Sequence, residues 1–170
     1  MKKRNLDNKG FTLVELIVVL VILAILAAIL VPALLGYIDQ AKSKQSMINA
    51  RTVLTAAQAE LSSIYGSKAE PEAIQVGGNH NANFKKTADF DNLTPSVNKV
   101  TIACKKDFEK GASAKPRNEQ HDAFTVVYME YIDESVTLYY DGTTGEWFEG
   151  ADSKPTIANK GSEFVVYGGN

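Results

Sequence analysis

The sequence predicts an α+β protein in which one long N-terminal helix is followed by an antiparallel β-sheet. Two observations support this. A long apolar run fills the start of the chain, and segments rich in Val, Thr, Tyr and Ile, separated by turn residues, fill its last half. The 170 residues, of which 45% are hydrophobic and 22% are charged, are enough for one modest domain and an anchor. We therefore expect helix first and strands afterwards, without a second domain.

The apolar run extends from Gly10 to Leu35 and reads GFTLVELIVVLVILAILAAILVPALL. Glu15 is its one charged residue, and no charge occurs from Leu16 to Ile38, a stretch of 23 residues. At about 1.5 Å per helical residue, this stretch is long enough to cross a hydrocarbon core of about 30 Å. We expect residues 11–38 to be inserted in a membrane at some stage.

A short basic leader, MKKRNLDNKG, precedes the apolar run. Lys and Arg remain on the cytoplasmic side of a membrane, so the N-terminus should lie inside and the residues after Tyr37 outside. A secretory signal has its small-residue cleavage site after the apolar segment, whereas here the small residue, Gly10, comes before it. Cleavage after Gly10 would remove the basic residues and keep the hydrophobic helix in the mature protein.

This arrangement resembles the class III leader of type IV prepilins. The matching residues are Gly10, Phe11, Thr12, Leu13, Glu15 and the apolar run through Pro32, with Ala33 and Leu34 behind it. The resemblance implies that a prepilin peptidase removes residues 1–10 and that the new N-terminal amine, on Phe11, is methylated. It also implies a pilin fold, in which residues 11–38 form the filament core and residues 39–170 form the globular head.

Glu15 is an acid inside an apolar helix, which is costly in a membrane and calls for a compensating partner. The resemblance implies that its carboxylate meets the N-terminal amine of a neighbouring subunit and sets the axial register. The alternative is local: Glu15 lies one turn from the amine of its own Phe11, and a Glu near a helix N-terminus gains from the dipole.

Pro32 lies inside the expected helix, where it removes one backbone hydrogen bond and favours a kink. A simple bend is tolerated in a membrane helix. The resemblance implies a further role in assembly, in which residues 24–32 loosen when subunits leave the lipid and pack in a filament.

Beyond the span, the apolar residues narrow to a stripe with helical spacing, typical of one helix face packed on a core. Its members are Met47, Ala50, Leu54, Ala57, Leu61 and Ile64. The polar residues between them, which include Asn49, Gln58 and Glu60, are expected to face water or a neighbouring subunit. Gly66 is the expected stop, so the helix should cover about 11–65.

Residues 67–96 are rich in Gly, Asn, Pro and charge and predict a long connection with at most a short element. The strands expected after it are Val97–Ala103, Ala123–Ile132, Ser135–Tyr140, Glu146–Phe148 and Phe164–Tyr167. A turn at 141–145 favours an antiparallel meander. Because Val136, Leu138 and Tyr140 alternate with Thr137 and Tyr139, one sheet face should lie on the helix stripe and the other should meet water.

Catalytic and binding motifs are weak in this sequence. It has no Gly-x-Ser-x-Gly elbow, no His-Glu-x-x-His and no EF-hand spacing of acids. His80 and His121 lie in polar stretches and are expected to be surface residues, and the aromatics near Trp147 are expected to pack across a hairpin. Removing the four bases and one acid of the leader changes the formal net charge from −2 to −5, which disfavours a nucleic-acid binder. We expect no enzyme, cofactor or metal site.

Cys104 is the single cysteine, so an intrachain disulfide is impossible. Many Gram-negative type IV pilins carry a C-terminal cysteine pair, and the sequence departs from that pattern. It is more similar to the cysteine-poor type IV pilins of Gram-positive bacteria. The domain must then close by strand pairing.

The resemblance implies a major pilin, which forms a homopolymer for adhesion, motility or aggregation, with the prepilin peptidase and the pilus assembly machinery as partners. The subunit should be a single-pass protein of the cytoplasmic membrane before assembly and an extracellular pilus component afterwards. The alternative is a minor pilin or pseudopilin of a type II secretion or DNA-uptake system. An enzyme or binding protein on a single-span anchor is disfavoured, because an anchor needs neither a cleavage site before the span nor an acid within it.

Overall fold

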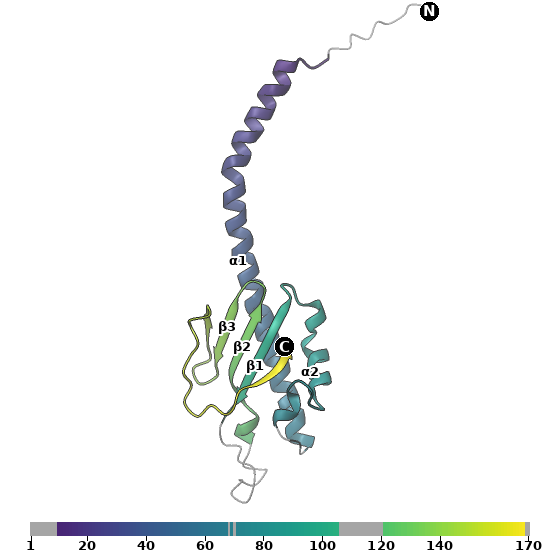
Figure 1. Cartoon of the computed structure of the whole chain (residues 1–170), viewed down its shortest axis with the longest axis vertical. Coiled ribbons are helices and arrows are strands. Elements are labelled where there is room, and N and C mark those ends of the chain that lie inside the picture. Colours follow the sequence, from purple (N-terminus) through teal and green to yellow (C-terminus); the bar gives the residue numbers. More distant parts are fainter. Residues whose placement is uncertain (1–9, 68, 70, 106–120, 169–170) are drawn as a thin grey trace, which may run out of the picture. The chain divides into compact units, whose positions relative to one another are not determined.

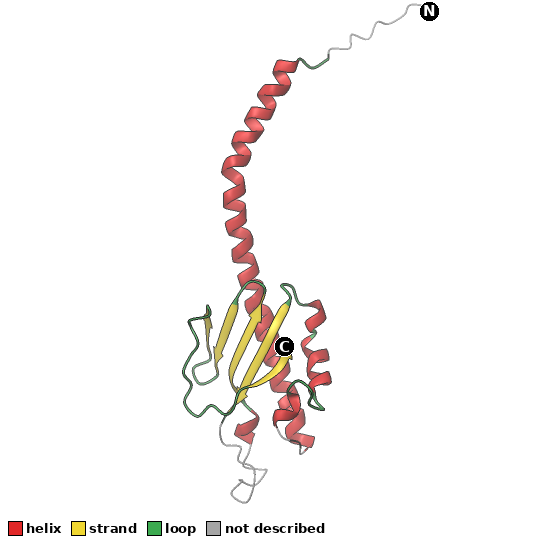
Figure 2. Ribbon diagram, in the orientation of Figure 1, coloured by secondary structure: helices red, strands yellow, loops and turns green. Residues whose placement is uncertain are grey.

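The computed structural model describes residues 10–67, 69, 71–105 and 121–168, so most of the predicted leader lies outside the described residues. Helix α1 (Leu13–Ser67) is followed by a shorter helix, α2 (Asn81–Ala88), and by five strands (Figures 1 and 2). The α+β prediction is confirmed. The chain divides into two compact units, Met1–Gln40 and Ala41–Asn170, which we describe separately; the second is called the head below.

Helix α1 begins at Leu13 and ends at Ser67, close to the predicted 11–65, and contains Pro32. The expectation that Gly66 stops the helix was wrong, because Gly66 is itself helical and one more residue follows. The Ser67 hydroxyl donates to the Ile64 carbonyl at 2.9 Å, which satisfies one of the carbonyls that every helix end leaves open. By length and composition, α1 is the one described helix that could cross a membrane.

In the head, the C-terminal half of α1 packs on the sheet, as the stripe predicted (Figure 2). Within the stripe, Ala50, Ala57, Leu61 and Ile64 are fully buried, and Met47 and Leu54 are partly buried. The stripe is wider than predicted, because Val53 and Ala56 are also buried. The sheet residues of the same core include Val100, Ile102, Met129, Leu138 and Val166.

The strands of the head are β1 (Val97–Cys104), β2 (Val126–Asp133), β3 (Thr137–Asp141), β4 (Glu146–Glu149) and β5 (Phe164–Gly168). They pair antiparallel in the order β4-β3-β2-β1-β5. Strands β1 to β4 form the predicted meander. The strand expected from residue 123 begins three residues later, because His121–Phe124 forms a short 3-10 helix.

The connection after α1 covers the outer edge of β5. It contains two short 3-10 helices, Pro71–Ile74 and Phe90–Asn92, on either side of α2. The buried Asn81 amide donates to the carbonyls of Ile74 at 2.7 Å and Val166 at 2.8 Å, and the Val76 N–H donates to the Val165 carbonyl at 2.9 Å. These bonds satisfy backbone groups that an edge strand would otherwise expose.

The second face of the sheet does not simply meet water, as the alternation of β3 had suggested. Because β4 and β5 lie at opposite edges of the sheet, residues 150–163 between them pass over this face. Ala103, Tyr128 and Tyr139 are buried there in a small cluster with Ile157, which comes from the connection. We call residues 150–163 the strap.

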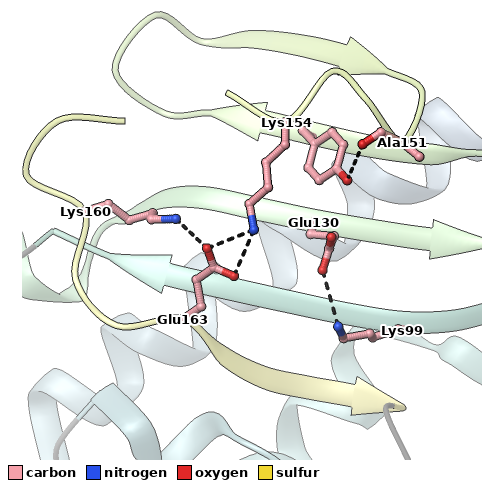
Figure 3. A network of polar contacts seen from close by, with 7 residues as sticks. Lys99, Glu130, Ala151, Lys154, Lys160 and Glu163 are labelled. Carbon is pink, nitrogen blue, oxygen red and sulfur yellow. Dashed lines mark hydrogen bonds and ion pairs between the residues drawn. The ribbon is translucent and has the colours of Figure 1, made fainter. Parts of the chain in front are cut away.

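Ion pairs hold the strap at its end (Figure 3). The Glu163 carboxylate binds the ammonium of Lys160 and, at 3.2 Å, that of Lys154. Burial raises the pKa of Glu163, but the hydrogen bonds and charges of Lys160 and Lys154 outweigh this effect and lower it. The two ammonium groups also lie over the ring of Tyr128, 4.3 Å from its centroid for Lys160 and 5.2 Å for Lys154. In a chain with one cysteine, the strap is thus closed by non-covalent contacts.

Candidate assembly segment at the N-terminus

Residues 10–12 precede the first turn of α1 and are not helical. Gly10 and Phe11 are exposed, and the Phe11 side chain is 82% accessible. A Cβ on Gly10 would meet nothing within 4 Å. Packing among the described residues therefore does not require glycine at position 10.

The helix that follows is apolar on all sides. From Leu13 to Ile38 its large hydrophobic side chains are between 40% and 74% exposed. The described residues of the chain offer these side chains no core to pack in. A surface of this size is stable in water only when lipid or other protein surfaces cover it.

Thr12 and Glu15 form a capping box at the start of α1. The Thr12 carbonyl accepts the first helical bond, from the Leu16 N–H at 3.2 Å, which identifies Thr12 as the N-cap. The Glu15 N–H donates to the Thr12 hydroxyl oxygen at 3.2 Å. In return, the backbone N–H and the hydroxyl of Thr12 donate to Glu15 Oε2, at 2.9 and 2.7 Å. Glu15 thus has a partner within its own chain.

We did not predict the capping role of Thr12 from the sequence, although the sequence contains the pattern for it. Thr12-Leu13-Val14-Glu15 has the Thr-x-x-Glu spacing of a capping box directly before an apolar run. The local interpretation of Glu15 considered the Phe11 amine and the helix dipole but not the hydroxyl next to them. Pro32, the other predicted assembly residue, is exposed and lies 17 positions after Glu15 in the same helix.

In the head, the polar residues that were expected to face water or a neighbouring subunit include two that are buried. Glu60 is buried and contacts His80, with 2.6 Å between Oε1 and Nδ1, so His80 is half-buried rather than a simple surface histidine. Asn49 is buried and donates to the Thr94 carbonyl at 3.2 Å. Of His121, the structure describes only the backbone. Among the described residues, no three His, Cys, Asp or Glu side chains are grouped to hold a metal ion.

A shallow groove of about 510 Å³ lies between α1 and the sheet in the head. Leu54, Gln58, Val126 and Tyr140 are among the residues that line it. The lining includes no carboxylate, histidine, lysine, arginine or cysteine. Its polar side chains are the amide of Gln58 and the hydroxyls of Thr55, Ser62, Thr125 and Tyr140. A hydroxyl nucleophile is activated by an adjacent base, and the lining places no His or carboxylate beside these hydroxyls.

Comparison with known proteins adds one match. The prokaryotic N-terminal methylation motif, which is the class III leader signal of type IV pilins, matches residues 5–31. No curated protein sequence and no solved structure matches the chain significantly. The matched region contains Gly10, Phe11 and Glu15 together with Thr12, and it ends one residue before Pro32.

Proposed function

We propose that this type IV pilin-like chain is the major subunit of a type IV pilus and polymerises through residues 11–38. Its methylation motif supports a protein of a pilus or pseudopilus, and the motif and the α+β fold indicate a structural protein rather than an enzyme. The single observation that supports polymerisation best is the exposure of every large apolar side chain from Leu13 to Ile38. These side chains need a cover that the described chain does not supply.

The cover changes during the life of the subunit. Before assembly, residues 11–38 lie in the cytoplasmic membrane with the N-terminus inside, as the leader charges favour. A prepilin peptidase then cuts after Gly10, and the new amine on Phe11 is methylated. In the filament, the same side chains pack against helices of neighbouring subunits, and this burial stabilises the polymer by about 25 cal/mol per Å². Residues 39–170, which include the head, reach surfaces and partners from the outside of the pilus.

Glu15 sets the register between subunits in this proposal. Its carboxylate pairs with the Phe11 amine of a neighbour, so that both charges are neutralised inside the filament. A buried pair of this kind adds little net stability, but removal of one partner leaves the other charge uncompensated. The pair would therefore determine the axial register of neighbouring subunits more than the strength of the contact between their apolar surfaces.

The proposal is tested with Glu15→Val in a strain without a wild-type copy. Filaments counted by electron microscopy should be absent or very rare, because the neighbour's amine loses its counter-charge. Intact mass should show loss of residues 1–10 in both variant and wild type, and the amount of membrane-inserted protein should be unchanged. Val14→Ala, a neighbouring change without charge, serves as the matched control and should assemble.

Normal filament number and length in the Glu15→Val strain would refute the intersubunit role. A chain that still begins at Met1 within filaments would refute the processing step. Immunogold labelling separates the major pilin from the alternative: long surface filaments composed of this chain support the major pilin. Short or absent filaments, together with a defect in secretion or DNA uptake, would assign it to the pseudopilins or minor pilins.

A further inference from the structure

The geometry of the capping box constrains Glu15 more than a helix-end effect requires. Both bonds that Thr12 donates to the carboxylate end on the same oxygen, Oε2. Among the described contacts, none ends on Oε1. The carboxylate therefore has one oxygen held inside the chain and one that can accept a hydrogen bond from outside it.

Thr12 is also the residue next to the proposed new N-terminus. Its backbone N–H, which donates to Glu15 at 2.9 Å, follows Phe11 directly in the chain. The carboxylate is thus folded back toward the start of the helix. A free glutamate side chain with three rotatable bonds would have no such fixed direction, and holding it in one direction costs conformational entropy at the moment of pairing.

We infer that Thr12 is a positioning residue for Glu15: its hydroxyl holds the carboxylate so that one oxygen faces the ammonium of a neighbouring subunit. This inference rests on the proposed function, since it concerns the same intersubunit pair. It adds Thr12, which contacts no neighbouring subunit itself and acts through Glu15. In the unassembled subunit, the same bonds satisfy a carboxylate that lies at the edge of a membrane span.

The hydroxyl can be removed with little change in shape. Thr12→Val keeps the size and branching of the side chain and keeps the backbone N–H, but it loses the bonds at 2.7 and 3.2 Å. Filament yield per inserted subunit should fall about fivefold, the factor that the loss of one N-cap interaction implies. Thr12→Ser restores the hydroxyl and should return the yield to within about twofold of wild type, because Ser is at least as good an N-cap as Thr.

Three further readouts separate positioning from a general structural role. The amount of membrane-inserted protein, the removal of the leader measured by intact mass, and the Trp147 fluorescence of the head should be the same in Thr12→Val, Thr12→Ser and wild type. A drop in insertion or processing in Thr12→Val would place the defect before assembly and overturn the inference. Equal loss of filaments in both Thr12 variants would also overturn it, because Thr12→Ser keeps the hydroxyl and should therefore assemble.

Glu15→Val, measured in parallel, keeps the inference and the proposed function apart. Normal filaments in Thr12→Val combined with none in Glu15→Val would overturn the positioning role and leave the intersubunit pair intact. Normal filaments in Glu15→Val would overturn the pair itself and the positioning role with it. Loss of filaments in Glu15→Val, a fivefold loss in Thr12→Val and recovery in Thr12→Ser is the expected result.

Discussion

Two stretches of the same helix behave in opposite ways. Along residues 13–40 of α1 every large hydrophobic side chain is at least 40% exposed, whereas along 41–67 the residues Ala50, Ala57, Leu61 and Ile64 are fully buried. Both stretches are helical, so secondary structure does not distinguish them. The difference is in the distribution of apolar residues, which surround the first stretch and form a stripe on the second. A stripe can be covered by the chain's own sheet, and an all-round surface needs lipid or other subunits.

The comparison implies that damage to the two stretches has different consequences. A change in the first stretch should leave the head folded and alter only what the helix does in a membrane or a polymer. A change on the stripe should lower the free energy of unfolding of the head. Trp147, the single tryptophan, lies in the head, so its fluorescence reports on head unfolding alone.

The largest expected effect is the difference between two Leu→Ala substitutions, one in each stretch of α1. Leu61→Ala removes a fully buried side chain from the core and should lower the free energy of unfolding by about 2 to 5 kcal/mol. Leu23→Ala changes a side chain that is 56% exposed and should leave the unfolding of the head unchanged. Denaturant titration of the detergent-solubilised chain, followed by Trp147 fluorescence, measures both. Equal destabilisation by the two variants would break the comparison.

The sequence predicted the stripe and the strands well because both depend on local periodicity. It failed for polar residues whose partners are distant in the chain. Asn49, Gln58 and Glu60 were expected to face water or a neighbouring subunit, yet within the chain they contact the Thr94 carbonyl, the backbone near Val126 and His80. A helical repeat shows which side of the helix a residue occupies. It does not show which backbone group a later segment brings to that side.

The strap is a second feature that periodicity could not predict. Alternation along β3 places Tyr139 on the face away from α1, and that part was correct. Whether this face meets water depends on the order of strands, since only the placement of β5 beside β1 carries residues 150–163 across it. By contrast, the Thr12–Glu15 box at the candidate site was readable from four consecutive residues, because a capping box is a local pattern.

A smaller effect on the free energy of unfolding is expected at Gln58. This residue tests how polar contacts attach the second stretch of α1 to the rest of the head. Its amide donates to the Phe124 carbonyl at 2.9 Å and accepts from the Val126 N–H at 3.0 Å. Gln58→Ala leaves both backbone groups without this partner and should lower the free energy of unfolding by about 1 to 3 kcal/mol. Gln75→Ala, at an exposed position, is the control and should be near neutral. A neutral Gln58→Ala would show that water replaces the amide at no cost.

The smallest effect is expected at the strap and depends on pH. The pKa of Glu163 is lowered in the folded head from its ordinary value of 4.5, through the bonds from Lys160 and Lys154 that outweigh burial. A carboxyl with a lowered folded pKa adds stability that is complete above its unfolded pKa and is lost as the pH falls through the folded one. Glu163→Gln should therefore destabilise the head at pH 7, and the difference from wild type should shrink below about pH 4.5.

The size of this difference follows from exposure. The side chain of Glu163 is 31% accessible, so the surrounding water screens its ion pairs and the loss at pH 7 should be no more than about 1 kcal/mol. Denaturant titrations from pH 3 to pH 7, followed by Trp147 fluorescence, measure the difference, with Glu134→Gln at an exposed turn position as the control. A difference between Glu163→Gln and wild type that stays constant, or grows, toward pH 3 would show that the ion pairs of Glu163 with Lys154 and Lys160 do not stabilise the head. The strap would then be held by Ile157 and the aromatic cluster beneath it, as the stripe of α1 is held, by burial alone.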